Sequence, residues 1–459
     1  MTLVEPTLPA ADRRLSLRLA DRITGDVVAG GMAPGELIGH EPDLMQRYGV
    51  SRGTLREAIR QIEARGVAEM RRGISGGLVV TGTPVSIAAD TLATYLEVSD
   101  ITLGEQFEVR FALEELAAGL AATRCSLDDI AAMRAAVASW RGIDDAAAAR
   151  EPHFALRRHI ARASGNPVLF FATSAIFQVT QDVSVLLTGA ADQVRHYLDG
   201  QIATKSALVE AIAAGDVCGA RALIRSERER VLAAEAIAPH LATPLPDLVL
   251  MAGDRSPPRE ERKLGMTTAL RLRRSIAAMG WPVGEHLGTE EQLRLRLGVS
   301  RGLVREALML LEVHGVVRLM RGRVGGILVG RPDPEAAIDA VLKLFRSVNL
   351  ADNHLGEICA ALDLLMIEAA MRGGDAAGLA GLNEPAALDY PGLRATLRDL
   401  SGNRVLAIVS DILRSIDPAA SRPPAQAGSR ATMEPLLHAL AARDSAIAQR
   451  MLRRIWQLA

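Results

Sequence analysis

The sequence has little that would place the protein outside a reducing compartment. It contains three cysteines in 459 residues, Cys125, Cys218 and Cys359, and their spacing forms no Cys-x-x-Cys pair. This usage provides neither a disulfide framework nor a zinc site. The sequence also shows no signal-peptide pattern and no apolar run long enough to cross a bilayer. We therefore expect a cytoplasmic protein without a membrane anchor.

An excess of either charge is also lacking, because 53 Lys and Arg face 54 Asp and Glu, which gives a net charge of −1. Taken as an average, this argues weakly against nucleic-acid binding. A DNA reader needs a basic face rather than a basic average, however. Six arginines gather in one short segment: Arg52, Arg56, Arg60, Arg65, Arg71 and Arg72. The length allows several domains.

Catalytic motifs are absent as well. We find no phosphate-cradling glycine loop, no paired acid and base motif and no nucleophile elbow. His153 and His159 lie near Arg157 and Arg158, but histidines among arginines on a helix are more often exposed or ion-paired than catalytic. We expect that the protein is not an enzyme and that it needs no cofactor.

What the chain does contain is one long internal repeat. The segment GVSRGTLREAI at residues 49–59 recurs as GVSRGLVREAL at residues 298–308, an offset of 249 residues. The same offset holds without a gap from Gly35-Glu36, which matches Gly284-Glu285, to the glycine pair at 76–77, which matches the pair at 325–326. A solenoid would repeat many times, at a period of roughly 20–50 residues. A single long repeat indicates a domain duplicated within the chain.

The repeated segment has the pattern of a winged helix-turn-helix. Apolar spacing predicts helices over residues 19–28, 41–48 and 52–65. A tight turn at 49–51 separates the last two, with Ser51 as the N-cap of the third. Residues 68–80 predict two short strands joined by a glycine-rich hairpin.

The third helix has the two faces that a DNA-recognition helix needs. Leu55, Ile59 and Ile62 share one face, and the arginines at 52, 56 and 60 share another. Arginine can grip phosphate or a guanine edge in two places, and the N-terminal turn of such a helix enters the major groove. Arginines on one face are usually only solvated. Here the preceding turn, the following hairpin and the repetition favour DNA recognition.

These residues resemble the GntR family of bacterial transcription regulators. The resemblance implies that the turn, the recognition helix and the wing of each copy contact the operator. The implied DNA-binding residues are Ser51, Arg52, Thr54, Arg56, Arg72 and Gly76, then Ser300, Arg301, Leu303, Arg305, Arg321 and Gly325. Relatives often carry a basic residue where Pro42 and Glu291 stand, so each copy loses a phosphate contact. Because Leu303 replaces Thr54, we expect the two copies to read different bases.

Residues 85–239 have a nearly continuous helical pattern that resembles the FCD effector domain of the FadR branch of that family. The matching segments are 107–114, 160–167 and 211–216. In the family this domain binds a small ligand and holds the dimer together.

The metal site of many relatives, one Asp and three His, is not kept. Its positions hold His153, Arg157, Lys205 and Glu227. Protonated Arg and Lys cannot be ordinary metal ligands, so we predict no metal. Two interpretations stay open for these residues. Arg110, Arg157 and Lys205 form an anion pocket for a small ligand, or Glu227 neutralises the cations in an ion-pair cluster.

Residues 334–459 repeat the helical domain in eroded form. The offset of 249 holds to about residue 367 and becomes 237 at Asn403, which matches Asn166, so about twelve residues are missing. Cys359 replaces Arg110, whereas an arginine is kept at 394. Met433 and Ile455 take the places of Lys205 and Glu227. We interpret this copy as a packing scaffold, with a loop over residues 418–428.

The sequence therefore predicts a mainly α protein with two winged helix-turn-helix domains, each followed by an all-α helical bundle, the second one degenerate. The expected bounds are 12–82 (first head), 85–239 (first helical domain), 240–262 (linker), 263–331 (second head) and 334–459 (second helical domain). The expected function is a sequence-specific, ligand-responsive repressor that acts as an intramolecular pseudo-dimer on an imperfect palindrome in double-stranded DNA. A small anionic metabolite would bind the first helical domain. A constitutive or architectural DNA-binding protein with decayed pockets is the alternative, and a further homodimer stays open.

Overall fold

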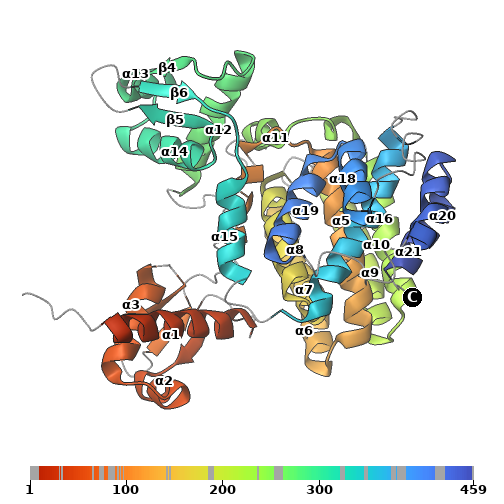
Figure 1. Ribbon diagram of the computed structural model, residues 1–459, viewed down its shortest axis with the longest axis horizontal. Coiled ribbons are helices and arrows are strands. Elements are labelled where there is room, and N and C mark those ends of the chain that lie inside the picture. The colour runs from red at the N-terminus through yellow and green to blue at the C-terminus, as the bar shows by residue number, and fades with distance from the viewer. Residues whose placement is uncertain are drawn as a thin grey trace, which may run out of the picture. The chain divides into compact units, whose positions relative to one another are not determined.

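The computed structural model divides the chain into two compact units, and Figure 1 shows their elements. One unit comprises residues 1–90 with 340–351, and the other comprises 91–339 with 352–459. The structure describes residues 10–456 except 30–31, 33–34, 65–66, 72–76, 81–87, 90–91, 94, 97, 141–142, 144–145, 184–190, 235–236, 253–261, 321–325, 346–349, 374–378, 380–388 and 419–429. Within these described residues, every helix is too short or too polar to traverse a bilayer.

The first head is a winged helix-turn-helix, as predicted. Its elements are α1 (Ala10–Ala29), β1 (Leu37–Gly39), α2 (Glu41–Tyr48), α3 (Arg52–Ala64), β2 (Ala68–Arg71) and β3 (Gly77–Val80). The strands form an antiparallel sheet in the order β1-β3-β2. The apolar face of α3 packs into a core with α1 and the sheet, where Leu55 and Ile62 are fully buried. This packing leaves the arginine face of α3 outward.

The second head repeats this arrangement. Its elements are α12 (Arg262–Ala278), β4 (His286–Gly288), α13 (Glu290–Leu297), α14 (Arg301–Val313), β5 (Val317–Met320) and β6 (Gly326–Val329), and its sheet has the order β4-β6-β5. In both heads the turn before the recognition helix begins with a left-handed glycine. Gly49 has φ 63° and Gly298 has φ 67°. Glycine adopts this conformation without steric cost.

The core of the second head includes a residue from outside the head. Val98, which lies just before the first helical domain, packs among the buried side chains of α12 and α14. Arg273 of α12, 1% exposed, donates to the Val98 carbonyl at 3.0 Å and to Asp100 Oδ1 at 3.0 Å. This buried arginine is charge-paired and fixes the second head to the start of the first helical domain.

His314, at the end of α14, gives a prediction for pH dependence. It is 2% exposed, and burial lowers its pKa from 6.5 to about 4. Between these values the unfolded chain binds a proton that the folded chain does not, so stability falls as pH falls, by about 3 kcal/mol in total. We expect the free energy of unfolding, measured with urea on the full chain, to decrease between pH 7 and pH 4.5. The His314→Gln variant should not show this decrease. If its free energy of unfolding falls with pH as steeply as that of the wild type, His314 is not its cause.

The first helical domain consists of helices, as its sequence pattern predicts. They are α5 (Leu103–Arg124), α6 (Leu127–Ala138), α7 (Ala146–Ala163), α8 (Pro167–Val183), α9 (Ala191–Ala213) and α10 (Val217–Ala233). Reciprocal capping boxes begin α5 at Thr102 and α6 at Ser126. The central helix α5 contacts α7, α8, α9 and α10, and its buried face positions the polar residues discussed below.

The segment predicted as a linker contains structure. The short 3-10 helix η2 (Ala238–His240) is followed by α11 (Leu245–Ala252), which packs against α8 and α12. Leu245 and Leu248 are fully buried, one helical turn apart. The prolines in this segment suggested a flexible connection, but the i, i+3 leucines give the helix an apolar side to bury.

The helix α15 (Glu335–Phe345) follows the second head, and its residues from 340 on belong to the unit of the first head. The second helical domain contains α16 (Asp352–Gly373), α18 (Tyr390–Ser401), α19 (Arg404–Ile416), α20 (Arg430–Ala441) and α21 (Ser445–Ile455). Of the predicted 418–428 loop, all but Pro418 lies outside the described residues.

The two helical domains contact each other through reciprocal hydrogen bonds between α5 and α19 and between α8 and α16 (Figure 1). Asn166 Nδ2 donates to the His354 carbonyl at 2.8 Å and to Glu357 at 2.9 Å. Asn403 Nδ2 donates to the Glu105 carbonyl at 3.0 Å and to Glu108 at 2.9 Å. These four acceptors are related by the 249-residue offset of the repeat. Two ion pairs also join the domains, Arg124 with Glu357 and Arg372 with Glu108, although the two arginines are one residue out of register with the repeat.

Candidate nucleic-acid interface and effector sites

One glutamate holds the two leading arginines of the first recognition helix. Arg52 donates to both Glu41 carboxylate oxygens at 3.1 Å, and Arg56 Nε donates to Oε1 at 2.9 Å. Glu41 begins α2, so the helix-turn-helix itself aligns this acceptor with α3. The arginine side chains are 63% and 59% exposed. Both side chains are therefore held by one carboxylate and remain open to a ligand.

The second head has the same arrangement. Arg301 Nε and Arg305 Nε donate to Glu290 Oε1 at 3.0 and 2.8 Å, and their side chains are 67% and 59% exposed. Both heads thus have one glutamate that accepts hydrogen bonds from the first two arginines of the recognition helix. Hydrogen bonds from Arg52 and Arg56 lower the pKa of Glu41 to about 2, so it stays ionised at neutral pH. Each head therefore presents two cations held by one carboxylate.

The helix-capping serines occupy their predicted places, whereas Thr54 lies deeper than predicted. Ser51 Oγ accepts from the Thr54 amide at 3.2 Å, and Ser300 Oγ accepts from the Leu303 amide at 3.3 Å. Thr54 is 5% exposed, with its hydroxyl 2.9 Å from Ser51 Oγ. In this conformation Thr54 stabilises the start of α3. A base contact by its hydroxyl requires that bond to open and stays a prediction, as does the contact expected from the half-buried Leu303.

The predicted wing residues Arg72, Gly76, Arg321 and Gly325 lie outside the described residues. The strands beside the wing show how it is anchored. Glu63, near the end of α3, accepts from the Met70 amide at 2.9 Å, and Glu312 accepts from the Leu319 amide at 3.1 Å in the second head. These glutamates couple the recognition helix to the first wing strand in both copies.

The two recognition helices differ beyond Thr54 and Leu303. Arg60 of α3 pairs with Glu57 at 3.0 Å and stays 59% exposed. Its counterpart on α14 is Met309, which is 63% exposed, and Val313 nearby is 52% exposed. The first head therefore carries one more cation on its recognition helix than the second.

In the first helical domain, the five predicted ligand residues do come together. Arg157 contacts Glu227 at 3.1 Å and donates to His153 Nε2 at 2.8 Å, and Lys205 pairs with Glu227. Glu114, which the sequence interpretation did not include, pairs with Arg157 and accepts from Arg110 at 2.6 Å. These contacts are those of the ion-pair alternative.

This cluster is deeply buried. The side chains of Arg157, Lys205 and Glu227 are 4%, 2% and 2% exposed. Burial alone would raise the pKa of Glu227, but Lys205 and Arg157 outweigh it and hold that pKa well below its ordinary value. Burial and the neighbouring cations lower the pKa of His153, which is therefore a neutral acceptor. The guanidiniums of Arg110 and Arg157 also lie over the Phe177 ring, at 5.7 and 5.0 Å.

The residues at the family's metal positions do not fit a metal ion. Arg157 and Lys205 are cations already bound to Glu227, which leaves His153 and Glu227 as the available donors. Among the residues that the structure describes, no group of three or more His, Cys, Asp or Glu could hold an ion.

The second helical domain keeps one ion pair of this cluster. Arg394 Nε donates to Asp363 Oδ1 at 2.6 Å, in the places of Arg157 and Glu114. Tyr390 and Trp456 donate to Asp363 Oδ2 at 2.5 and 3.1 Å. Cys359 is buried, and burial raises the pKa of its thiol to about 11, so it is a packing residue. Met433 and Ile455 are buried apolar side chains, as their types predict.

Comparison with known proteins agrees with the geometry of the heads. Residues 15–77 and 265–327 match the bacterial regulatory proteins of the gntR family, and residues 105–229 match the FCD domain. An uncharacterized HTH-type transcriptional regulator of Mycobacterium tuberculosis is 28% identical over 218 residues, which is 48% of this chain and 88% of the relative. A putative L-lactate dehydrogenase operon regulatory protein of Escherichia coli is 29% identical over 220 residues, 46% of this chain and 81% of that protein.

Among solved structures, a GntR protein of Streptococcus agalactiae is 20% identical, with a TM-score of 0.31, and covers 47% of this chain and 98% of its own. The two head matches, the FCD match and the named regulators together give one assignment. The chain carries two segments that match the GntR-family helix-turn-helix and one that matches the FCD domain, and it is a DNA-binding transcription regulator.

Proposed function

We propose that the chain acts as an intramolecular pseudo-dimer whose two heads read the two halves of one imperfect palindrome. Heads in successive major grooves would read half-sites about 34 Å apart. The predicted contacts are Arg52 and Arg56 in one half-site, and Arg301 and Arg305 in the other. DNA phosphate or guanine would replace Glu41 and Glu290 as partner of these arginines.

The reciprocal asparagine contacts carry this proposal. In a two-fold dimer, residue i of one subunit contacts j of the other, and j contacts i in return. Asn166 with Glu357 and Asn403 with Glu108 have this relation, although all four belong to one chain. The Arg124–Glu357 and Arg372–Glu108 pairs resemble this exchange, but their arginines are 248 residues apart and so are one residue out of register with the repeat. This exchange supports a pair of helical domains that does the work of a family dimer.

The unequal heads support an imperfect operator. Leu303 offers only apolar contact, for example to a thymine methyl group, where the first head has Thr54. Met309 replaces Arg60, so the second head has one phosphate contact fewer to offer. We therefore expect the half-site of the first head to contribute more to affinity and to its salt dependence.

The proposal includes a small anionic effector in the first helical domain. Three cations, Arg110, Arg157 and Lys205, face two carboxylates in a buried cluster, which leaves one positive charge over. A carboxylate or phosphate would supply the missing counter-charge. The helical effector domain is what supports the FadR branch. Repression released by ligand rests on resemblance to that branch alone.

The alternative is a constitutive DNA-binding protein in which the ion-pair cluster is purely structural. The cluster's own pairing favours it, since each cation already has a carboxylate partner. The two hypotheses predict different results in one experiment. For a constitutive protein, operator affinity would not respond to carboxylate or phosphate metabolites.

Asn166→Ala with Asn403→Ala tests the pseudo-dimer. The double variant loses all four hydrogen bonds that the two asparagine side chains donate across the domains, which weakens the contact between them, although the Arg124–Glu357 and Arg372–Glu108 pairs stay. We expect affinity for DNA with both half-sites to fall at least about tenfold, because two heads that are held less firmly gain less from effective concentration. Affinity for a single half-site should stay unchanged. Fluorescence anisotropy with both DNAs measures this, after light scattering has fixed the oligomeric state.

Asn353→Ala is the matched control. Its amide donates to Glu357 within α16 at 2.8 Å and makes no cross-domain bond among the described contacts. It should bind both DNAs as the wild type does. Equal loss on the single and double half-sites in the Asn166 and Asn403 variant would reject the pseudo-dimer.

A further inference from the structure

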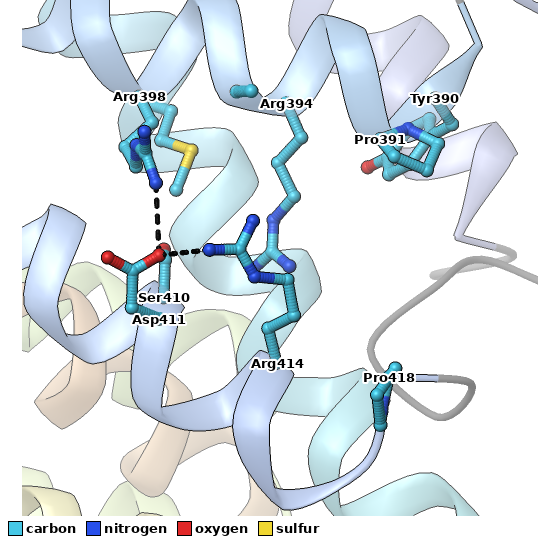
Figure 2. Close-up of a pocket in the computed structure, with 10 residues that line it drawn as sticks. Tyr390, Pro391, Arg394, Arg398, Ser410, Asp411, Arg414 and Pro418 are labelled. Atoms are coloured by element: carbon cyan, nitrogen blue, oxygen red, sulfur yellow. Dashed lines mark hydrogen bonds and ion pairs between the residues drawn. The ribbon is translucent and has the colours of Figure 1, made fainter. Parts of the chain in front are cut away.

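The second helical domain contains a cavity of about 80 Å³ between α18 and α19, shown in Figure 2. Its counterpart in the first helical domain measures about 20 Å³. Arginines and a serine line the larger cavity: Arg394 and Arg398 from α18, Ser410 and Arg414 from α19. A water molecule occupies about 30 Å³ in the liquid, so the space admits an oxyanion group rather than a whole large ligand.

The cavity wall has more positive than negative charge. Arg398 and Arg414 both donate to Asp411 Oδ1, at 2.9 and 2.6 Å, as the dashed lines in Figure 2 show. Arg394 also lines the cavity, and its Nε donates to Asp363 Oδ1. Arg398 also donates to Asp399 Oδ1, from Nε at 3.1 Å. Arg414 has five N–H donors, and its bond to Asp411 uses one of them. Its other donors can meet an anion.

Ser410 is an independent sign of a ligand. It is 6% exposed, and its hydroxyl has no hydrogen-bond partner among the described residues. A buried hydroxyl on a helix usually donates to the carbonyl four residues earlier. Thr173, at the same place in the first helical domain, does so, with its hydroxyl 2.8 Å from the Leu169 carbonyl. Ser410 instead presents an unused donor in the cavity wall.

Comparison within the repeat shows what changed. At the offset of 237, Arg398 stands where the first domain has Ala161, and Arg414 stands where it has Phe177. Phe177 packs beneath Arg157 in the smaller cavity. Replacing this ring and a methyl group by two guanidiniums leaves a wider space and adds two cations. The same comparison adds two carboxylates that pair with these arginines, Asp399 in place of Arg162 and Asp411 in place of Ser174.

We propose that this cavity binds the carboxylate or phosphate group of a small metabolite, so that the second helical domain is an effector site with its own ligand. Arg398 and Arg414 would grip the oxyanion, with Ser410 donating a third hydrogen bond. The rest of the ligand would extend out of the cavity beside Arg414, whose side chain is 58% exposed. This site is separate from the buried cluster of the first domain.

Isothermal titration calorimetry of the full chain tests the proposal. The probes are inorganic phosphate and succinate at constant ionic strength, with chloride as the reference anion. We expect saturable binding of at least one probe, and the preferred probe identifies the oxyanion class. Arg414→Phe and Arg398→Ala introduce the first-domain residues, and each should weaken binding at least about tenfold. Ser410→Ala should weaken it severalfold.

Arg134→Ala provides the matched control, because Arg134 is an exposed arginine that pairs with Glu210 in the first helical domain. It should bind as the wild type does. Circular dichroism shows whether each variant folds, and three independent variants keep the test decisive if one does not. Binding of neither probe, or undiminished binding in folded Arg414→Phe and Arg398→Ala, would overturn the proposal. The readout is independent of operator binding, so its failure is distinct from failure of the pseudo-dimer.

Discussion

Arg52→Ala is expected to weaken operator binding by about 1–3 kcal/mol, which is roughly 5–150-fold in affinity. Two effects combine in this loss. The variant removes a guanidinium that faces DNA, and it leaves the ionised Glu41 carboxylate with Arg56 alone. Arg301→Ala should act in the same way through Glu290. If Arg52 contacts only phosphate, all DNA sequences should weaken alike and the salt slope should fall by about one unit.

Fluorescence anisotropy at fixed salt, with DNA from upstream of the protein's own gene, measures both variants. Arg52→Ala with Glu41→Gln separates the two effects, because the amide no longer repels phosphate and part of the affinity should return. A loss for both single variants indicates two working heads. A loss for Arg52→Ala alone indicates that the second head is a relic. Wild-type affinity and salt slope in Arg52→Ala would refute its assigned role.

Glu227→Gln is expected to destabilise the first helical domain by about 3–5 kcal/mol, the usual effect of breaking a buried ion pair. The change leaves Lys205 and Arg157, both nearly fully buried, with Glu114 as their remaining carboxylate. Burial then lowers the pKa of Lys205 further below its unfolded value. Unfolded chains therefore bind more protons than folded ones at intermediate pH, so the variant should regain stability as pH rises toward 10.

Urea unfolding at several pH values measures this. Glu227→Met with Lys205→Met is the control, since an apolar pair of similar volume in place of a buried ion pair is often neutral or stabilising. It should lose less stability than Glu227→Gln, and the pH dependence should vanish. A loss below about 1 kcal/mol in Glu227→Gln would show that water screens the cluster.

The parts of the fold that the sequence predicted are those fixed by neighbouring residues. The recognition helices begin at Arg52 and Arg301 because a left-handed glycine and a capping serine precede each of them. The helical pattern of residues 85–239 likewise predicted a helical domain, because apolar spacing is local. Partners distant along the chain were harder to foresee. Glu41 lies eleven residues before Arg52, and nothing in either segment alone shows that the helix-turn-helix brings them together.

The candidate site was only partly foreseen for a related reason. Comparing the two helical domains at the family's metal positions drew attention to Met433 and Ile455, which are apolar. The informative substitutions lie elsewhere: Arg398, in place of Ala161, is one turn beyond Arg394 on α18, and Arg414, in place of Phe177, is on the next helix, α19. A residue-by-residue comparison at the offset of 237 would have found them, but only the packing of α18 on α19 shows that they line one cavity.

The contacts that join the two helical domains have a consequence for the number of molecules a cell needs. Separate subunits dissociate on dilution. At low concentration, the concentration of the dimer therefore falls with the square of the subunit concentration. Here Asn166 and Asn403 belong to one polypeptide, and their partners stay within reach at any dilution. Halving the number of chains would then halve the number of two-headed DNA-binding molecules instead of reducing it to a quarter. Operator occupancy would follow gene dosage in proportion, even at a few molecules per cell.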